Sequence, residues 1–332
     1  MNKLLSALAA VSLLAACKDG SVGDGPEGGG TAGGGPPSVG GFAQGGAPSV
    51  EGCSIFPADN PWNQDVSGFE VHPSSDAFID SIGRDTGMHA DFGTVYEGAP
   101  IGIPFTVATA TTPKVPVVFV ASPEESDPGP YPIPPDAPIE GGGVEDGDRH
   151  VIVVDTDSCM LYELFHSFPL DGGASWEADS GAVFDLASNQ TRPAGWTSAD
   201  AAGLPIFPGL VKYSEIVEGG SLDHAVRITV SQSQAGYIAP ATHFASSDND
   251  PNLPPMGLRL RMKASYDCSA YSTEVQTLCA GFKRYGLIVA DNGSDWYVSG
   301  APDSRWNDEA LADIANIVGD AFEVVFTGDV VN

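Results

Sequence analysis

Short β-type runs that end at proline or glycine constrain the fold of this chain more than any other feature. Runs such as 115–120 (VPVVFV) and 225–230 (AVRITV) are rich in β-branched residues, and their length is that of an ordinary β-strand. We expect further strands at 103–107, 150–154, 159–166, 181–186, 258–263, 287–290, 296–299 and 322–326. Helical patterns are few and short, at 75–83, 198–202, 273–285 and 308–317.

The 27 prolines leave little room for long helices, because proline breaks a helix interior. The sequence therefore predicts a mainly β fold: a single β-sandwich or jelly-roll-like domain with a few short helical insertions. We place this globular domain at residues 52–332, since no second Gly/Pro-rich linker interrupts that range.

The N-terminus carries the pattern of an export signal over residues 1–16. Lys3 precedes an apolar run that ends in Leu14-Ala15-Ala16-Cys17, and these four residues resemble the lipobox of bacterial lipoproteins. The resemblance implies cleavage before Cys17, lipidation of Cys17, and anchoring at the bacterial outer membrane or cell surface. An ordinary signal peptide with a chance cysteine, or a short membrane helix, is the alternative. Residues 17–51 are mostly Gly, Pro, Ser and Ala and predict a flexible tether.

Charge and cysteine content exclude several classes of protein. A formal net charge of −30 disfavours a nucleic-acid or anionic-lipid binder, so membrane contact is expected through the lipid anchor only. The four remaining cysteines, Cys53, Cys159, Cys268 and Cys279, suit two disulfides in an exported chain. Cys268 and Cys279 are close enough to pair locally, which would leave Cys53 for Cys159, although other pairings remain open. No CxxC pair points to a metal site.

A row of cations stands out in this acidic chain. Arg259, Arg261 and Lys263 alternate with Leu258, Leu260 and Met262, so a strand would place the three cations on one face. They either neutralise carboxylates such as Glu163, Asp185 and Asp291, or bind an anionic or hydroxyl-rich polymer as substrate.

The predicted hairpin 150–166 offers the first catalytic candidate. Glu163 lies between Leu161 and Phe165 on the face expected to be buried, and burial raises the pKa of a carboxyl group, as a general acid requires. Asp155, at the turn, is a candidate second carboxylate, since two carboxylates across a cleft hydrolyse glycosides. The alternative is that Glu163 forms a buried structural ion pair.

Two further clusters are candidates. His243 precedes the polar run Asp248-Asn249-Asp250 and is a candidate acid or base; the run has the oxygen density of a Ca²⁺ loop but lacks the EF-hand spacing.

The segment Asp291-Asn292-Gly293-Ser294-Asp295-Trp296-Tyr297 combines a candidate catalytic carboxylate, Asp291, with Trp296 and Tyr297, which would form an aromatic platform for a sugar. Its Asn-Gly pair also favours an ordinary hairpin turn.

No GxSxG, HExxH, Walker A or GxGxxG motif occurs in a suitable context. The segments THFASS (242–247), PPMGLRLRMKAS (254–265) and IVADNGSDWY (288–297) resemble an uncharacterised group of secreted actinobacterial and myxobacterial proteins. The resemblance covers most of residues 53–327 and supplies no catalytic residues.

These features favour a surface-tethered carbohydrate-active enzyme, most simply a glycoside hydrolase that acts on an extracellular polysaccharide or another cell-surface polymer. The alternatives are a non-catalytic surface lipoprotein that binds a glycan or a protein, and a polysaccharide lyase with His243 as base and Arg259 and Arg261 neutralising a uronate. No cofactor is expected, apart from Ca²⁺ at Asp248–Asp250.

Overall fold

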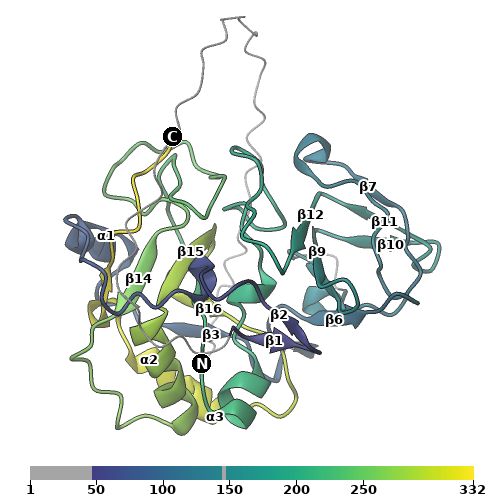
Figure 1. The fold of residues 1–332 in the computed structure, drawn as a ribbon. Coiled ribbons are helices and arrows are strands. Elements are labelled where there is room, and N and C mark those ends of the chain that lie inside the picture. Colours follow the sequence, from purple (N-terminus) through teal and green to yellow (C-terminus); the bar gives the residue numbers. More distant parts are fainter. Residues whose placement is uncertain (1–46, 144–146) are drawn as a thin grey trace, which may run out of the picture. The chain divides into compact units, whose positions relative to one another are not determined.

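Two sheets organise the computed structural model, which describes residues 47–143 and 147–332 (Figure 1). The larger has six strands in the order β17 (Phe322–Val324), β14 (Arg259–Met262), β15 (Leu287–Asn292), β13 (Val226–Val230), β16 (Tyr297–Ser299) and β3 (His89–Asp91). The second has four strands in the order β12 (Ser180–Asp185), β9 (Met160–Phe165), β8 (Val151–Asp155) and β6 (Phe105–Ala108). The fold is mainly β with sandwich-like sheets, as predicted. The expected signal peptide, Cys17 and nearly all of the tether lie outside the described residues.

Three smaller sheets complete the β structure. One has the order β10 (Phe168–Leu170), β11 (Ser175–Ala178) and β7 (Val117–Phe119). The others are two-stranded, β1 (Ser49–Val50) with β2 (Cys53–Ser54), and β4 (Val95–Tyr96) with β5 (Ala99–Pro100).

The predicted hairpin is confirmed as β8 and β9, which pair antiparallel from Val151–Leu164 to Asp155–Met160. Its residues alternate between two cores, because successive side chains of a strand point to opposite faces. Ile152, Val154 and Leu161 pack in the main core. Val151 and Val153 pack in a second core, together with Trp176 of the three-stranded sheet. The hairpin is therefore covered on both faces, which accounts for its nearly continuous apolar sequence.

Residues 287–299 do not form the hairpin that Asn292-Gly293 favours. Strand β13 lies between β15 and β16, parallel to β15 and antiparallel to β16. The apolar residues of 225–230 fill the central position of this sheet, and Val226, Ile228 and Val230 are fully buried. The burial of β13 therefore outweighs the local preference of Asn292-Gly293 for a hairpin turn.

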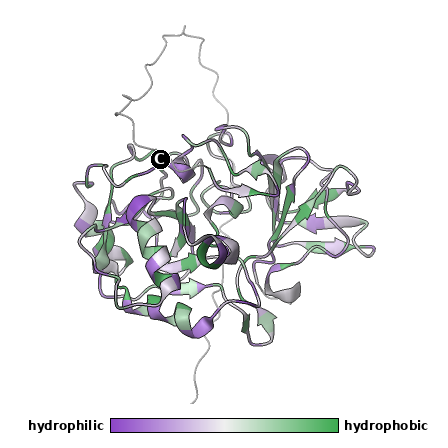
Figure 2. Cartoon of the chain, turned by 60° about the horizontal axis from the view of Figure 1, so that its bottom comes forward, coloured by the Kyte–Doolittle hydropathy of each residue, from purple (hydrophilic) through white to green (hydrophobic). Residues whose placement is uncertain are grey.

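Helices are short and lie at the predicted places, with one exception. The α-helices are α1 (Ser75–Ile82), α2 (Thr273–Arg284) and α3 (Asp308–Leu311). The short 3₁₀ or π segments are η1 (Pro61–Asn63), η2 (Pro123–Glu125), η3 (Glu140–Gly143), η4 (Phe207–Gly209), η5 (Ser214–Gly219), η6 (Ala312–Asn316) and η7 (Gly319–Ala321). Figure 2 shows hydrophobic segments in the strands and alternating hydrophobic and hydrophilic residues along the helices. Residues 198–202 are bends and turns instead of the predicted helix, because Ser198 binds the backbone around it.

Both disulfides have the predicted pairing. Cys53 bonds to Cys159, and Cys268 bonds to Cys279. Disulfides of this kind are typical of extracellular or periplasmic proteins. Within 47–143 and 147–332, no helix is both long and apolar enough to cross a membrane.

Candidate functional site

Polar residues occupy one face of the six-stranded sheet where β15, β13, β16 and β3 lie side by side. The register places Arg227 opposite Ser299, and Ser299 beside Asp91. The next row contains Thr229, Tyr297 and His89. The alternate residues Ile228 and Val298 are fully buried in the main core. The polar set therefore belongs to the opposite face of the sheet.

A β-bulge brings Asp291 onto this polar face. Ile228 pairs with Val289, but the next residue, Thr229, pairs with Asp291 instead of Ala290. Without this shift Asp291 would follow the core-facing set, since one residue of slip exchanges the two faces of a strand. The bulge therefore aims the Asp291 carboxyl group toward Arg227.

Arg227 connects the carboxylates of this face. Its Nε lies 3.0 Å from Asp200 Oδ2, and its two terminal nitrogens lie 2.7 Å from Ser299 Oγ and 3.4 Å from Asp291 Oδ2. Asp200 is only 1% exposed, and its Oδ1 has no hydrogen-bond partner. Asp291 is accessible, with 25% of its side chain exposed.

His150, directly before β8, and Glu140, in η3, form a second charged pair. His150 Nδ1 lies 2.5 Å from Glu140 Oε2, and His150 Nε2 lies 3.0 Å from the carbonyl oxygen of Ala199. Because a carbonyl oxygen only accepts, Nε2 carries a proton, and Nδ1 donates to the carboxylate. His150 is therefore a buried imidazolium, joined through Ala199 to the segment that holds Asp200. The carboxyl group of Asp148 lies within 4.8 Å of this pair.

We call Asp91, Glu140, Asp148, His150, Asp200, Arg227 and Asp291 the charged cluster. Burial and the charge of Asp200 raise the pKa of Asp291 to about 7, although Arg227 opposes the shift. Burial, with Glu140, also raises the pKa of Asp91. Burial opposes a charge on His150, yet Glu140 raises its pKa to about 9. The cluster thus holds protonated and ionised groups together near neutral pH, as acid–base catalysis requires.

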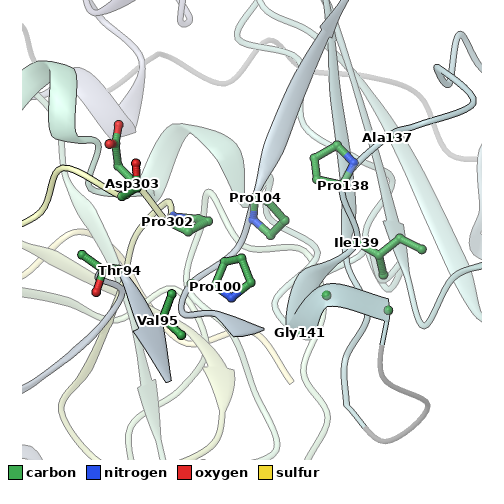
Figure 3. A pocket seen from close by; sticks show the side chains of 14 residues that line it. Thr94, Val95, Pro100, Pro104, Ala137, Pro138, Ile139, Gly141, Pro302 and Asp303 are labelled. Atoms are coloured by element: carbon green, nitrogen blue, oxygen red, sulfur yellow. The ribbon is translucent and has the colours of Figure 1, made fainter. Parts of the chain in front are cut away.

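A cavity of about 550 Å³ lies beside the segments that carry Glu140 and Asp91, although none of the seven residues of the charged cluster is among its lining residues. Its walls include Ile139 and Gly141, the residues on either side of Glu140, and Thr94, which follows β3. Four prolines line it, Pro100, Pro104, Pro138 and Pro302, and their rings surround the space in Figure 3. Ligand cavities commonly have this size and apolar character.

The structure places Glu163 away from solvent. Its side chain is 0% exposed, and its oxygens accept hydrogen bonds from the backbone N–H groups of Ile206 and Phe207 at 2.8–3.0 Å. Burial outweighs these hydrogen bonds and raises the pKa of Glu163 to about 7. Neither the expected ion pair nor a route for substrate is present at this carboxyl group.

Asp155 and His243 are also held by backbone groups. Asp155 Oδ1 accepts from the amides of Asp157 and Ser158 in the hairpin turn. His243 Nδ1 lies 2.7 Å from the carbonyl oxygen of Ala201. The side-chain bonds of Arg227 go to Asp200, Ser299 and Asp291, so neither Asp155 nor His243 is among its partners.

The cation row binds the chain itself. Arg259 donates to the carbonyl oxygens of Pro61 and Gln64. Arg261 binds Glu323 and the carbonyl oxygens of Val66, Ser67 and Phe69. Lys263 donates to the carbonyl oxygen of Asp320. Arg261 and Lys263 pair with Glu323 and Asp320 instead of the expected Glu163, Asp185 and Asp291, and the side-chain hydrogen bonds of Arg259 go to carbonyl oxygens.

The two residues of the predicted aromatic platform lie on opposite faces of the sheet. Trp296 is 0% exposed, donates to the carbonyl oxygen of Gly83 and stacks on Phe322, so its ring belongs to the core. Tyr297 is half-buried on the polar face and stacks on exposed His89 at 4.2 Å.

The predicted calcium loop is held by its own backbone. Asp248 Oδ1 accepts from the amide of Asp250, whose carboxylate accepts from Asn252. The one potential metal-binding group found within the described ranges is Glu140, Asp148 and His150. Both His150 nitrogens are occupied there, so this group does not fit a metal ion as it stands.

Of the predicted site residues, the structure places Asp291 in the charged cluster and Tyr297 on the same sheet face, while Asp91, Glu140, Asp148, Asp200 and Arg227 were not predicted. One signal was available: Arg227 is a single cation within the apolar run AVRITV, and a buried arginine needs carboxylate partners. No family model, curated protein or solved structure matches this chain.

Proposed function

We propose that this protein is an exported glycoside hydrolase and that the charged cluster is its active site. The observation that carries the proposal is the convergence of several carboxyl groups, of which Asp91 and Asp291 lie half-buried on one face of the six-stranded sheet. Glycoside hydrolysis needs a protonated and an ionised carboxyl group at the same site.

Asp291 is the general acid in this proposal. It is accessible, and a pKa of about 7 keeps it mostly protonated in mildly acidic solution and about half protonated at neutral pH. Asp91, half-buried on the same face, is the second carboxyl group. Asp200 and Arg227 position Asp291 through the hydrogen bonds of the arginine. Tyr297 and His89 form the stacking surface for a sugar ring.

The proposed cellular location follows from the sequence of residues 1–51. We propose that Cys17 anchors the protein at the outer membrane or cell surface, and that residues 17–51 let the domain reach an extracellular polysaccharide. The two disulfides support an oxidising compartment. A lyase is less well supported, because Arg259 and Arg261 bind the chain's own carbonyl oxygens.

The test compares the wild type with Asp291→Asn on a panel of extracellular polysaccharides, measuring new reducing ends and the absorbance of unsaturated uronate. We expect reducing ends without that absorbance. We also expect kcat/KM to fall at least ~100-fold in the variant, with binding retained. Asp248→Asn, in an exposed loop, is the matched control. An unchanged rate in Asp291→Asn would contradict this site, and binding without cleavage by the wild type would indicate a glycan-binding lipoprotein.

A further inference from the structure

The charge of the candidate site points to its substrate class. We infer that the charged cluster accepts a saccharide with free amino groups, such as a glucosamine polymer, in preference to a uronate. This inference rests on the proposed function for its location, and its binding test is independent of turnover.

A ligand that approaches the charged cluster meets carboxylates first. Asp148 is exposed, and Asp91, Glu140 and Asp291 are half-buried. The two cations of the cluster, Arg227 and His150, are buried. They are also occupied: Arg227 by Asp200, Ser299 and Asp291, and His150 by Glu140 and the carbonyl oxygen of Ala199. The groups offered to a ligand are therefore acceptors for N–H donors.

The cluster has more carboxyl groups than cations. Five carboxyl groups share the two buried cations Arg227 and His150, and exposed His89 lies near Asp91. The Asp200 Oδ1, buried within this network, has no hydrogen-bond partner. The pKa values of Asp91, Asp200 and Asp291 are raised by burial, so ionising all three is unfavourable in the unliganded protein. An ammonium group placed among them would supply the missing positive charge.

The cations nearest the cavities are already paired with acids. Lys212 and Arg305 line a second cavity of about 290 Å³ that shares Pro104, Pro302 and Asp303 with the first. Lys212 binds Glu215 and the carbonyl oxygen of Leu210. Arg305 binds Asp303 and Glu218. A uronate needs a bidentate arginine or a cluster of cations, and these two side chains would have to leave their partners to provide one.

The cluster suits an organic amine better than a resident metal ion. A metal needs deprotonated ligands that converge, but His150 has a proton on each nitrogen and Glu140 is paired with it. The apolar cavity begins at Ile139 and Gly141, the residues that flank Glu140, so a polymer bound at the cluster could place the C–H faces of neighbouring sugar rings there while the carboxylates bind the amino groups.

The test measures binding by titration calorimetry, using purified full-length protein with both disulfides oxidised. The probes are hexamers of glucosamine, N-acetylglucosamine and galacturonate, in mildly acidic buffer with EDTA. We expect the glucosamine hexamer to bind at least ~10-fold more tightly than the other two, and to weaken as salt is added. Asp91→Asn and Asp148→Asn should each weaken it several-fold. Asp148 is exposed, so its variant is expected to fold normally, and exposed Glu177→Gln is the matched control.

Equal or tighter binding of the acetylated or galacturonate hexamer would overturn the inference. So would glucosamine binding that Ca²⁺, added without EDTA, abolishes at stoichiometric concentration, because the cluster would then be a metal site. Measuring both binding and cleavage distinguishes a failure of this inference from a failure of the proposed function. Tight glucosamine binding without cleavage would support the inference and contradict the hydrolase. Cleavage of neutral polymers without preference for amines would support the hydrolase and contradict the inference.

Discussion

At the scale of single residues, the groups that bind a carboxyl side chain help to distinguish a structural carboxyl group from a catalytic candidate. Glu163 has backbone amides as partners, Asp200 has Arg227, and Glu140 has His150. The partners of Glu163 and Asp200 could not be identified from local sequence patterns, because they lie 44 and 27 residues away, whereas His150 lies 10 residues from Glu140. Asp291 differs from Glu163 and Asp200 in being accessible as well as perturbed. We therefore base the predictions for Glu163 and Asp291 on opposite roles.

Glu163→Gln is expected to alter stability rather than turnover. The folded-state pKa of Glu163, about 7, is above its ordinary value of 4.5, so the folded protein holds this proton more tightly than the unfolded chain. The resulting stabilisation is complete below about pH 4.5 and is lost as the pH rises through 7. The difference in unfolding free energy, wild type minus variant, should therefore fall across this window, by on the order of 3 kcal/mol.

Urea unfolding at several pH values measures this difference. Subtracting the variant removes the titration of groups common to both proteins, although Asp200 and His150 lie close enough to interact with Glu163. A flat difference would show that Glu163 does not titrate in this range. A collapse of cleavage in the variant would restore Glu163 as a catalytic candidate.

Asp291 is expected to control the alkaline limb of the activity profile. A general acid must be protonated, and the pKa of Asp291 is about 7, so kcat/KM should fall as the pH rises through about 7. The profile should be recorded for a polysaccharide and for an aryl glycoside. The aryl leaving group needs little protonation, so its limb should be weaker. Identical limbs for both substrates would argue against Asp291 as the acid.

At the scale of elements, the sequence identified most strands but not how they pair. Runs such as 287–290 and 296–299 were recognisable from composition, whereas the insertion of β13 between them depends on contacts with residues about 60 positions away. The bulge that directs Asp291 also arises from this pairing. The charged cluster could not be predicted from the sequence, since its members come from β3, η3, the residues just before β8, β13, β15 and the 198–202 segment.

Strand β14 shows a second consequence of pairing, because its cations hold the segment 61–69 against the sheet. Arg261 binds Glu323 and three carbonyl oxygens of this segment. Arg261→Met should lower the free energy of unfolding by about 2–3 kcal/mol, since it leaves these acceptors unpaired. Denaturant unfolding measures the loss. Lys263→Met is the matched control on the same strand, and it should cost less than about 1 kcal/mol because Lys263 is more exposed. Equal losses would mean that the contacts of Arg261 with 61–69 are dispensable.

At the scale of the whole molecule, the two disulfides constrain very different lengths of chain. Cys53–Cys159 spans 106 residues and ties the start of the domain to the turn of the β8–β9 hairpin, whereas Cys268–Cys279 spans 11 residues beside α2. In the chain-entropy account, closing the longer loop stabilises the folded state by about 5 kcal/mol and closing the shorter one by about 3 kcal/mol. The long-range crosslink should therefore dominate.

The double variants Cys53→Ser/Cys159→Ser and Cys268→Ser/Cys279→Ser test this order by urea unfolding. We expect the first to lose about 2 kcal/mol more than the second, because removing the longer loop returns more conformational freedom to the unfolded chain. Both pairs are buried or nearly so, so the serine substitutions carry a comparable polar cost and the difference between them isolates the loop length. The opposite order would mean that the hairpin and the N-terminal segment remain associated in the unfolded chain, with the main-core contacts of Ile55 and Leu161 as the first place to look for that residual structure.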